Sequence, residues 1–467
     1  MINFGFINHA ELVHFLFALI LYYIHGLIML TLKIVQETVA KLSTAPSETL
    51  PNSQKKSVGI GELRMQSYIK QGNHYLVTLE EQLDPLGKFV FFFAGHIQVE
   101  EIRGVWITNI DSNILNSKEN IKAGLTKLKK SGFNTLYPVV WNKGFAFFKS
   151  SVTSSSFNST ADQLRNANLQ TELAGRDILA ELIEVNQELD SHFRIILWLE
   201  YGLMIPLNAP LAVDKPNWLM KTNTNEKVVN GNAWLNPTHP EVQNFFVNLV
   251  TELIQNYQVH GVQLDDHFGV PHLDKDGSLV SMGFDDFTLE LFKQDNPGAA
   301  NPKSNPRSEK FKTWRKEKVT TLLRLVFNTV KGIKKDCVVS ISPNPLAFSI
   351  DNFLADWQAW EQEGIAEEIV IQIYRSSLTS FKDEISKNEV ELARKHIPTV
   401  IGILSGLNGK RVHLNLIKQQ TQATRDRDFA GYSYFFYGSL FDLGADGDTP
   451  ESRQAEFATL LASDRFV

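Results

Sequence analysis

Two stretches of the chain decide its fold: Ile195-Ile196-Leu197-Trp198-Leu199-Glu200 and Gly261-Val262-Gln263-Leu264-Asp265-Asp266-His267. Each starts as a short apolar run and ends in an acidic residue. A strand needs such a run when both of its faces are buried, as they are when helices cover a parallel sheet on both sides. The pattern therefore predicts parallel strands that carry polar side chains where they end.

Similar stretches lie on either side of these two and alternate with amphipathic helical patterns. The eight strand candidates are Gly104–Thr108, Thr135–Val140, Ile195–Glu200, Gly261–Asp265, Val338–Ser342, Ile369–Tyr374, Thr399–Leu404 and Gly431–Phe436. The helical candidates include Ser117–Lys130, Asp177–Asp190, Pro240–Tyr257, Phe311–Lys335, Phe381–His396 and Leu414–Asp426. Eight such repeats predict an α/β protein, a closed (β/α)8 TIM barrel over residues 101–466. A doubly wound open sheet is the alternative, although no Gly-x-Gly-x-x-Gly motif follows the first strand.

Residues 1–100 form an N-terminal extension in this interpretation. The apolar segment 15–32 has the length of a short membrane span or signal peptide, and a buried amphipathic helix is the other interpretation. Residues 40–57 are rich in Ser, Thr, Pro and Lys, which is typical of a linker. We expect the extension to pack weakly on the barrel, because the eight-strand core is complete without it.

Charge and cysteine content exclude several classes of function. The net charge is −6 and the pI is about 6.1, which argues against nucleic-acid binding because that requires a basic surface. Cys337 is the only cysteine, so the chain has neither an internal disulfide framework nor a cysteine-based zinc site. We expect no cofactor and no bound metal.

The segments that leave the second, third and fourth strands are long. Residues 201–239 follow the third strand, and residues 266–307 follow the fourth. Barrel enzymes carry their chemistry on the loops that follow the strand ends. The sequence therefore predicts a cleft over strands two to four.

Two acids are expected to share that cleft. Side chains alternate along a strand, so if Leu197 and Leu199 face the helices, Glu200 faces the barrel axis, and the same parity turns Asp265 inward. Hydrolysis of a glycosidic bond needs two carboxyl groups, one to protonate the leaving oxygen and one to act as nucleophile or to activate water. Burial and crowding separate the pKa values of such groups. Glu200 and Asp265 are therefore the candidate catalytic residues.

Other roles for these acids stay open. A structural ion pair would explain a buried acid, but the strands from the third to the sixth show no inward basic residue. Asp265, Asp266 and His267 could together ligate a metal ion. Asp266 and His267 could instead bind sugar hydroxyls. Asp111 is a further acid, for which a place in a turn is the simpler interpretation.

Polar and aromatic residues near the strand ends are candidates for substrate binding. Amide and hydroxyl groups can hydrogen-bond to sugar hydroxyls, and aromatic rings offer apolar faces on which pyranose rings can stack. The candidates are Asp111, Tyr201, Asp266, His267, Asn344, Gln372 and Tyr374, with Trp141 and Trp234 for stacking.

Several ordered motifs together resemble the glycosyl-hydrolase-like 10 family of bacterial envelope proteins. They are residues 101–109, 134–138, Trp198-Leu199-Glu200-Tyr201-Gly202-Leu203-Met204, Trp234-Leu235-Asn236-Pro237, residues 261–269, Ser342-Pro343-Asn344-Pro345 and Gln372-Ile373-Tyr374-Arg375. The resemblance implies a barrel related to glycosidases, in which Asp265 corresponds to the acid of the fourth strand. It also implies an exported or lipid-anchored protein that acts on cell-wall glycan. The chain departs from the family in the hundred residues that precede the barrel.

Three hypotheses follow. The first is a glycoside hydrolase that acts on an envelope polysaccharide, with peptidoglycan glycan strands as a candidate substrate. The second is a barrel that binds glycan without cutting it. The third is a metal-dependent hydrolase that uses Asp265, Asp266 and His267. The expected location is the cell envelope, either periplasmic or membrane-anchored through residues 15–32.

Overall fold

The computed structural model describes residues 30–153, 164, 169–189, 193–274, 276–407, 410–441, 449–462 and 466. Within them, eight parallel strands close into a barrel, because β9 pairs with β8 as well as with β11. In barrel order the strands are β8 (Ile102–Ile107), β9 (Thr135–Asn142), β11 (Arg194–Leu199), β14 (Gly261–Asp265), β15 (Val338–Ser342), β16 (Glu368–Gln372), β17 (Thr399–Leu404) and β20 (Gly431–Phe435). The predicted barrel is confirmed, and the predicted strand ends differ from the observed ones by two residues at most.

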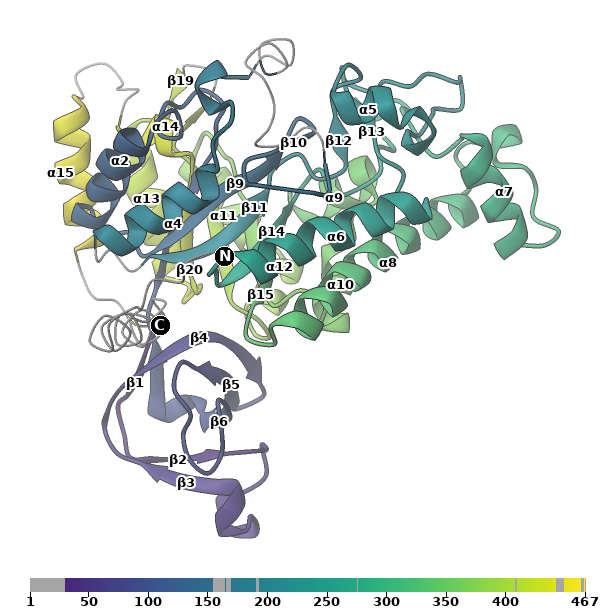
Figure 1. Ribbon diagram of the computed structural model, residues 1–467. Helices are drawn as coiled ribbons and strands as arrows, with labels where there is room; N and C mark the ends of the chain where they lie inside the picture. The colour runs from purple at the N-terminus through teal and green to yellow at the C-terminus, as the bar shows by residue number, and fades with distance from the viewer. Residues whose placement is uncertain are drawn as a thin grey trace, which may run out of the picture.

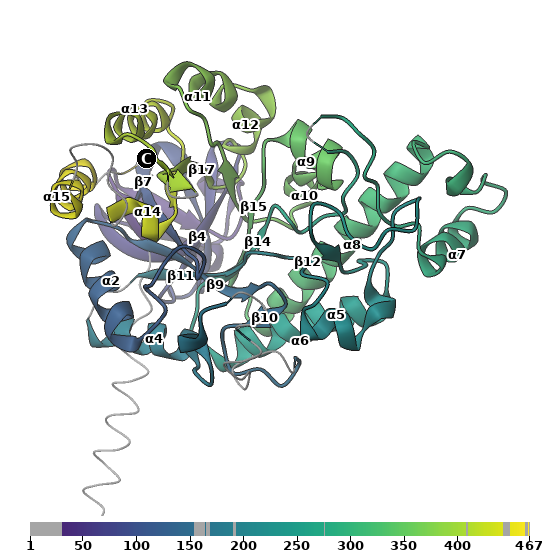
Figure 2. The same cartoon turned by 90° about the horizontal axis from the view of Figure 1, so that it is seen from above.

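Helices surround the strands, as Figure 2 shows in a view along the barrel. The main ones are α2 (Lys118–Lys130), α4 (Ile178–Glu188), α6 (Pro240–Asn256), α8 (Glu309–Ile333), α10 (Trp357–Glu363), α13 (Leu414–Arg425) and α15 (Pro450–Leu461). The predicted helix Phe381–His396 is wrong in one respect, because it is two helices, α11 (Leu378–Ile385) and α12 (Asn388–Ala393). Ser386 caps the first helix and Lys387 adopts an extended backbone, so the chain turns between them.

Shorter elements lie in the connections. They are β10 (Phe145–Ala146), β12 (Met204–Ile205), α5 (Pro210–Asp214), β13 (Ala233–Trp234), α7 (Asp286–Asp295), α9 (Leu346–Phe353), β18 (Gly406–Leu407), β19 (Lys410–Arg411) and α14 (Tyr437–Phe441). Four of them, β12, α5, β13 and α7, belong to the long segments after β11 and β14. These segments build up one side of the barrel (Figure 2).

A hydrogen bond across the barrel interior fixes which strand residues face the axis. Trp106 on β8 donates from Nε1 to Oε1 of Gln263 on β14, at 2.8 Å. Two strands, β9 and β11, separate β8 from β14 in the sheet, so this bond has to cross the interior. The ring of Trp198 lies 6.3 Å from that of Trp106, measured between centroids. The alternation of side chains then directs Asp265, two residues beyond Gln263, toward the same axis.

Residues 30–99 form a second sheet, which is antiparallel. Its strand order is β3 (Lys55–Val58), β2 (Thr38–Lys41), β6 (Phe89–Phe93), β5 (His74–Leu79), β4 (Gly61–Gln71), β1 (Leu30–Ile34) and β7 (Ile97–Val99). The linker interpretation of residues 40–57 is therefore wrong, because that stretch contains the end of β2, two short 3-10 turns and the start of β3.

The apolar segment 15–32 lies mostly outside the described residues. Its last residues, Leu30 to Leu32, are buried and begin β1. None of the helices in the described ranges combines the length and the apolar character that a bilayer crossing requires.

The antiparallel sheet covers the end of the barrel where the strands begin (Figure 1). The backbone N–H of Lys70 on β4 donates to the carbonyl of His396, just before β17, at 2.7 Å. Arg194 and Glu368, at the starts of β11 and β16, form a buried ion pair in which Nη1 and Oε2 are 2.7 Å apart. Tyr68 of β4 is buried, and its hydroxyl group interacts electrostatically with both members of this pair. Buried apolar side chains of the sheet and the barrel form one continuous cluster. The expectation of weak packing is therefore wrong.

Replacing Tyr68 tests this contact between sheet and barrel. Tyr68→Ala is expected to lower the free energy of unfolding by about 2–4 kcal/mol, because it opens a cavity beside a buried ion pair. Urea unfolding followed by circular dichroism measures the change. Phe89→Ala is the matched control, since Phe89 lies in the same sheet but is exposed. Equal stability of the two variants would mean that the sheet does not support the barrel.

Candidate active site

Glu200 follows the last residue of β11 and is buried at the open end of the barrel. Its Oε2 accepts a hydrogen bond from Oγ1 of Thr108 and another from Nδ2 of Asn142, both at 2.7 Å. Asn142 also donates to Oδ1 of Asn109 at 2.9 Å. Residues from the ends of two neighbouring strands, β8 and β9, thus hold one carboxyl oxygen of the residue that follows β11. With Oε2 accepting two donors, a proton on this carboxyl group would sit on Oε1.

Burial decides the protonation of Glu200. It raises the pKa of this carboxyl group to about 7, although the hydrogen bond from Thr108 and the charges of His267 and Lys143 oppose the rise. A carboxyl group with such a pKa is partly protonated near neutral pH. It can therefore give up a proton and take one back, which an ordinary glutamate does poorly at that pH.

Asp265 ends β14 beside Glu200 on the same rim of the barrel, since β11 and β14 are neighbouring strands. Its Oδ1 accepts hydrogen bonds from Oγ of Ser342 at 2.8 Å and from Nε2 of Gln372 at 2.9 Å. Burial, together with the adjacent charge of Asp266, raises the pKa of Asp265 well above its usual value. Two acids with raised pKa values therefore occupy adjacent strand ends.

Asp266 behaves in the opposite way. Burial disfavours its charge, but the neighbouring His267 and the hydrogen bonds it accepts lower its pKa below the usual value. Its Oδ1 lies 2.8 Å from Nδ1 of His267, and its Oδ2 accepts from Nδ2 of Asn344 at 2.5 Å. Burial opposes the charge of His267, yet Asp266 raises the pKa of this imidazole overall. Asp266 is thus the more readily ionised carboxyl group of the two, and Asp265 the more readily protonated one.

One metal-ligating cluster occurs in the part of the chain that the structure describes. Ligand atoms of Asp265, Asp266 and His267 all lie within 4.8 Å of one another, so these three residues could hold a metal ion. Asp266 and His267 already form an ion pair with each other, with 2.8 Å between Oδ1 and Nδ1. The donor set is compatible with a metal but does not require one.

Tyr201 and Tyr374 lie beside the carboxyl groups. Tyr201 stacks on His267, with 6.0 Å between ring centroids and 29° between ring planes, and it is half-buried. Tyr374 is half-buried as well, and burial together with the charges of Asp265 and its neighbours raises the pKa of this phenol well above its usual value. Both hydroxyl groups remain neutral at physiological pH and can hydrogen-bond to a ligand.

The two tryptophans that were predicted to stack on sugar are buried. Trp141 has no exposed surface, donates from Nε1 to the carbonyl of Gly202 at 3.0 Å, and packs against Phe245 of α6. Trp234 is 2% exposed, and its ring packs against His267. Trp141 anchors a loop and Trp234 supports the imidazole, because both are enclosed by the segments that follow β11 and β14.

Asp111 occupies a turn after β8. It is exposed, and its φ of 50° lies in the left-handed region that aspartate tolerates better than most residues. The turn interpretation is therefore confirmed. Asp111 acts electrostatically on Lys143, which also interacts with the charge of Glu200.

Sequence reasoning missed the residues that hold Glu200 and the cation near it. Thr108 and Asn142 are ordinary polar residues at strand ends, and nothing in their type marks them as partners of a particular acid. Lys143 is half-buried, and its charge acts on Glu200. Asn142-Lys143-Gly144 could have been recognised as a hairpin turn: Lys143 and Gly144 have φ values of 53° and 80° and join β9 to β10.

A closed parallel barrel with buried acids on the rim at its strand ends defines a class of glycosidase-like barrel proteins. The model of the family described as glycosyl hydrolase-like 10 matches residues 101–424, and the chain belongs to that family.

Two curated relatives carry related names. Over 155 residues the chain is 29% identical to glycosyl hydrolase DigH of Escherichia coli K12, a match that covers 30% of this chain and 31% of that protein. Over 326 residues it is 24% identical to glycosyl hydrolase YngK of Bacillus subtilis, covering 62% of this chain and 58% of the relative. In both cases the chain spans less than two thirds of the relative's length.

A solved structure has the same fold. The glycoside hydrolase domain of PgaB from Bordetella bronchiseptica superposes with a TM-score of 0.53 at 11% identity, over 76% of this chain and 98% of that domain. At this level of identity the likeness concerns the fold alone.

Proposed function

We propose that the chain hydrolyses glycosidic bonds in a polysaccharide of the cell envelope, with Glu200 and Asp265 as the catalytic pair. One observation carries the proposal: two buried carboxyl groups with raised pKa values stand at the ends of adjacent barrel strands. A protein that only binds glycan has little use for two buried acids, because burial of a carboxyl group opposes folding.

Glu200 is the proton donor in this proposal. Its pKa of about 7 and the position of its two hydrogen bonds on Oε2 leave Oε1 to protonate a leaving sugar oxygen. Asp265 is the carboxylate that faces the sugar carbon, either as nucleophile or as a stabilising charge. Asp265 reacts as the ionised carboxylate, so a proton bound to it passes to water before the glycosidic bond breaks. The positive charge that develops on the sugar ring then stabilises the carboxylate.

The surrounding groups support a sugar as ligand. Asp266, His267, Asn344, Gln372, Tyr201 and Tyr374 line the acids with donors and acceptors of the kind that sugar hydroxyls require. The family and the names of its relatives support a substrate with glycosidic bonds. Within that class we propose the glycan strands of peptidoglycan as the first candidate. This substrate would place the protein in the periplasm or on the outer side of a membrane, with the part of segment 15–32 that precedes β1 as a candidate anchor.

Incubation with purified cell-wall glycan tests the function. Soluble fragments should accumulate and show by mass analysis the addition of one water per cleaved bond. The Asp265→Asn variant serves as the blank. A preparation that binds the glycan but releases no fragment beyond this blank would favour the binding protein over the hydrolase.

The pH profile should report Glu200. Protonated Glu200 is the active form, and this form is lost as the pH rises through its pKa of about 7. We therefore expect kcat/KM to fall at higher pH, approaching about tenfold for each unit above that value. Rates measured in constant ionic strength buffers between about pH 5 and 9 check this. A rate that does not fall above about pH 7 would assign the proton transfer to another group.

A metal-dependent hydrolase is the second candidate, favoured by the closeness of Asp265, Asp266 and His267. Treatment with EDTA followed by desalting separates the two. Activity should remain within about twofold of the untreated protein, since carboxylate catalysis needs no ion. Loss of activity that zinc or another divalent ion restores would select the metal mechanism.

A further inference from the structure

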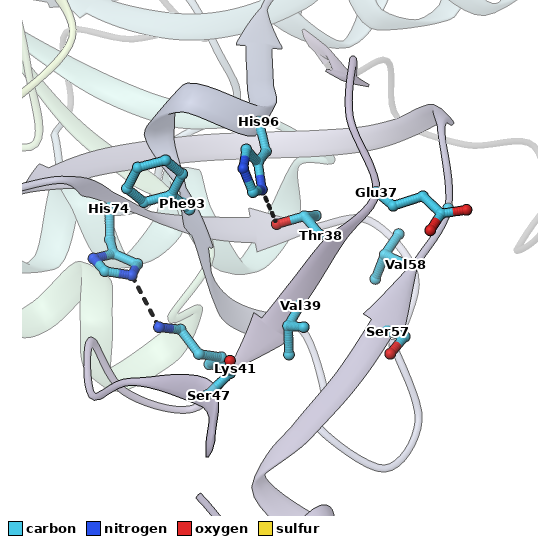
Figure 3. A pocket seen from close by; sticks show the side chains of 11 residues that line it. Glu37, Thr38, Val39, Lys41, Ser47, Ser57, Val58, His74, Phe93 and His96 are labelled. Carbon is cyan, nitrogen blue, oxygen red and sulfur yellow. Dashed lines mark hydrogen bonds between the residues drawn. The ribbon is translucent and has the colours of Figure 1, made fainter. Parts of the chain in front are cut away.

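A pocket of about 560 Å³ opens on the antiparallel sheet (Figure 3). The sheet covers the barrel end where the strands begin (Figure 1), whereas the carboxyl groups stand where the strands end. Its volume falls in the range of small-molecule sites. Lys41 and Thr38 of β2, His74 of β5 and Phe93 of β6 line it together with His96. Glu37 is exposed and lies at the side of the pocket away from Lys41 (Figure 3). None of these residues takes part in the barrel site.

Lys41 is a buried cation. It is 5% exposed, and its Nζ donates to the carbonyl of Ala45 at 2.7 Å and to Nε2 of His74 at 2.9 Å. No carboxylate in the described ranges lies within ion-pair distance of this ammonium group. Burial lowers the pKa of Lys41, and Glu48 offsets this only in part. A buried charge that has neutral partners alone is costly, so a bound anion would stabilise it.

The contact with Lys41 also determines which ring nitrogen of His74 carries the proton. An ammonium group can only donate, so Nε2 of His74 has to accept and Nδ1 has to carry the proton. Burial and the charge of Lys41 lower the pKa of His74, which keeps the ring neutral. His74 thus holds Lys41 by accepting its hydrogen bond. The two ring nitrogens of an imidazole point in nearly opposite directions, so Lys41 is the group that would meet a carboxylate.

Phe93 gives the pocket an apolar wall. It is 39% exposed, and its ring centroid lies 5.9 Å from that of His74 and 4.9 Å from that of His96, both in edge-to-face orientation. His96 is itself held by a contact of 3.1 Å between Nδ1 and Oγ1 of Thr38. An exposed aromatic ring flanked by polar rings suits a ligand that has an apolar face and a polar edge, as a pyranose has.

We propose that this pocket binds an anionic saccharide, a pyranose that carries a carboxylate, with the carboxylate on Lys41 and the ring on Phe93. The choice of a saccharide over other small carboxylic acids rests on the proposed function. The site is separate from the catalytic pair, so it would hold glycan without cutting it.

Calorimetric titration of the full chain tests the proposal with three probes: D-glucuronate, D-glucose and acetate. D-glucuronate should bind, and at the same concentrations D-glucose and acetate should bind at least about tenfold more weakly, because each offers only one of the two features. Lys41→Met and Phe93→Ala should each lower the affinity for D-glucuronate by about tenfold or more. The matched controls Lys56→Met and Phe89→Ala lie in the same sheet and do not line the pocket, so they should bind as the parent does.

Three outcomes would overturn the proposal: no heat with D-glucuronate, equal affinity for D-glucose, or equal affinity for acetate. Unchanged affinity in Phe93→Ala would overturn it too, and this exposed position keeps the test decisive even if Lys41→Met does not fold. The assay needs no turnover, and D-glucuronate should bind Asp265→Asn as it binds the parent. Failure of this site and failure of the proposed hydrolase are therefore seen in separate measurements.

Discussion

Asp265→Asn is expected to fold and to bind glycan, but to turn it over more slowly by at least about 10²-fold. Asparagine keeps the shape of the side chain and can still accept hydrogen bonds from Ser342 and Gln372 through its carbonyl oxygen. It lacks the negative charge that would attack or stabilise a sugar carbon in an oxocarbenium-like transition state. Release of reducing ends from cell-wall glycan, with the thermal midpoint as a check on folding, measures the effect.

Asp111→Asn is the matched control for that loss. It makes the same chemical change at an exposed turn after β8, and the turnover should stay close to that of the parent. Full activity of Asp265→Asn would exclude the carboxylate mechanism proposed for this barrel. Activity lost in Asp266→Asn instead would transfer the role to the neighbouring residue, which is the more readily ionised one of the two.

Glu200→Gln should lower turnover on natural glycan by about 10²–10⁴-fold, the usual contribution of a general acid. Glutamine can still accept the hydrogen bonds of Thr108 and Asn142 through its carbonyl oxygen, but it has no proton to give to the leaving oxygen. An aryl glycoside whose leaving group needs no protonation separates this role from a structural one. The variant should lose much less activity on the aryl substrate than on glycan, and the fall in rate above about pH 7 should disappear.

Equal losses of Glu200→Gln on both substrates would assign Glu200 to holding the site together. Retention of most activity on glycan, combined with loss in Asp266→Asn or Asp111→Asn, would show that the acid is another residue. Single substitutions at all four positions distinguish these cases.

The barrel could be predicted because its strands are buried on both faces and therefore stand out as apolar runs. The inward direction of Glu200 and Asp265 followed from the alternation of side chains along those runs. The partners of Glu200 could not be predicted, since Thr108 and Asn142 meet it only through the closure of β8, β9 and β11. Which residues come together in this way depends on the register between strands that lie far apart in the sequence.

The antiparallel sheet escaped prediction for a different reason. Its edge strand β3 (Lys55–Val58) is short and mostly polar, since an edge needs no apolar run and charged residues protect it from pairing with other chains. The prediction that Trp141 and Trp234 stack on sugar failed because a large aromatic ring can be buried in a core as well as exposed on a surface. Trp141 was assigned to the cleft, but contact with Phe245 of α6 encloses it, and no local pattern signals that contact.

The position of the antiparallel sheet determines how a long polymer could engage this molecule. The sheet covers the end of the barrel where strands begin, whereas the acids stand where strands end, so one short saccharide cannot occupy both regions (Figure 1). A saccharide held on the sheet would act as a tether, and its benefit would come from the raised local concentration of other segments of the same wall around the cleft. This gain in local concentration requires a ligand in which many glycan chains are joined. It is absent for a short soluble oligosaccharide, and it increases with the density of chains on an insoluble surface.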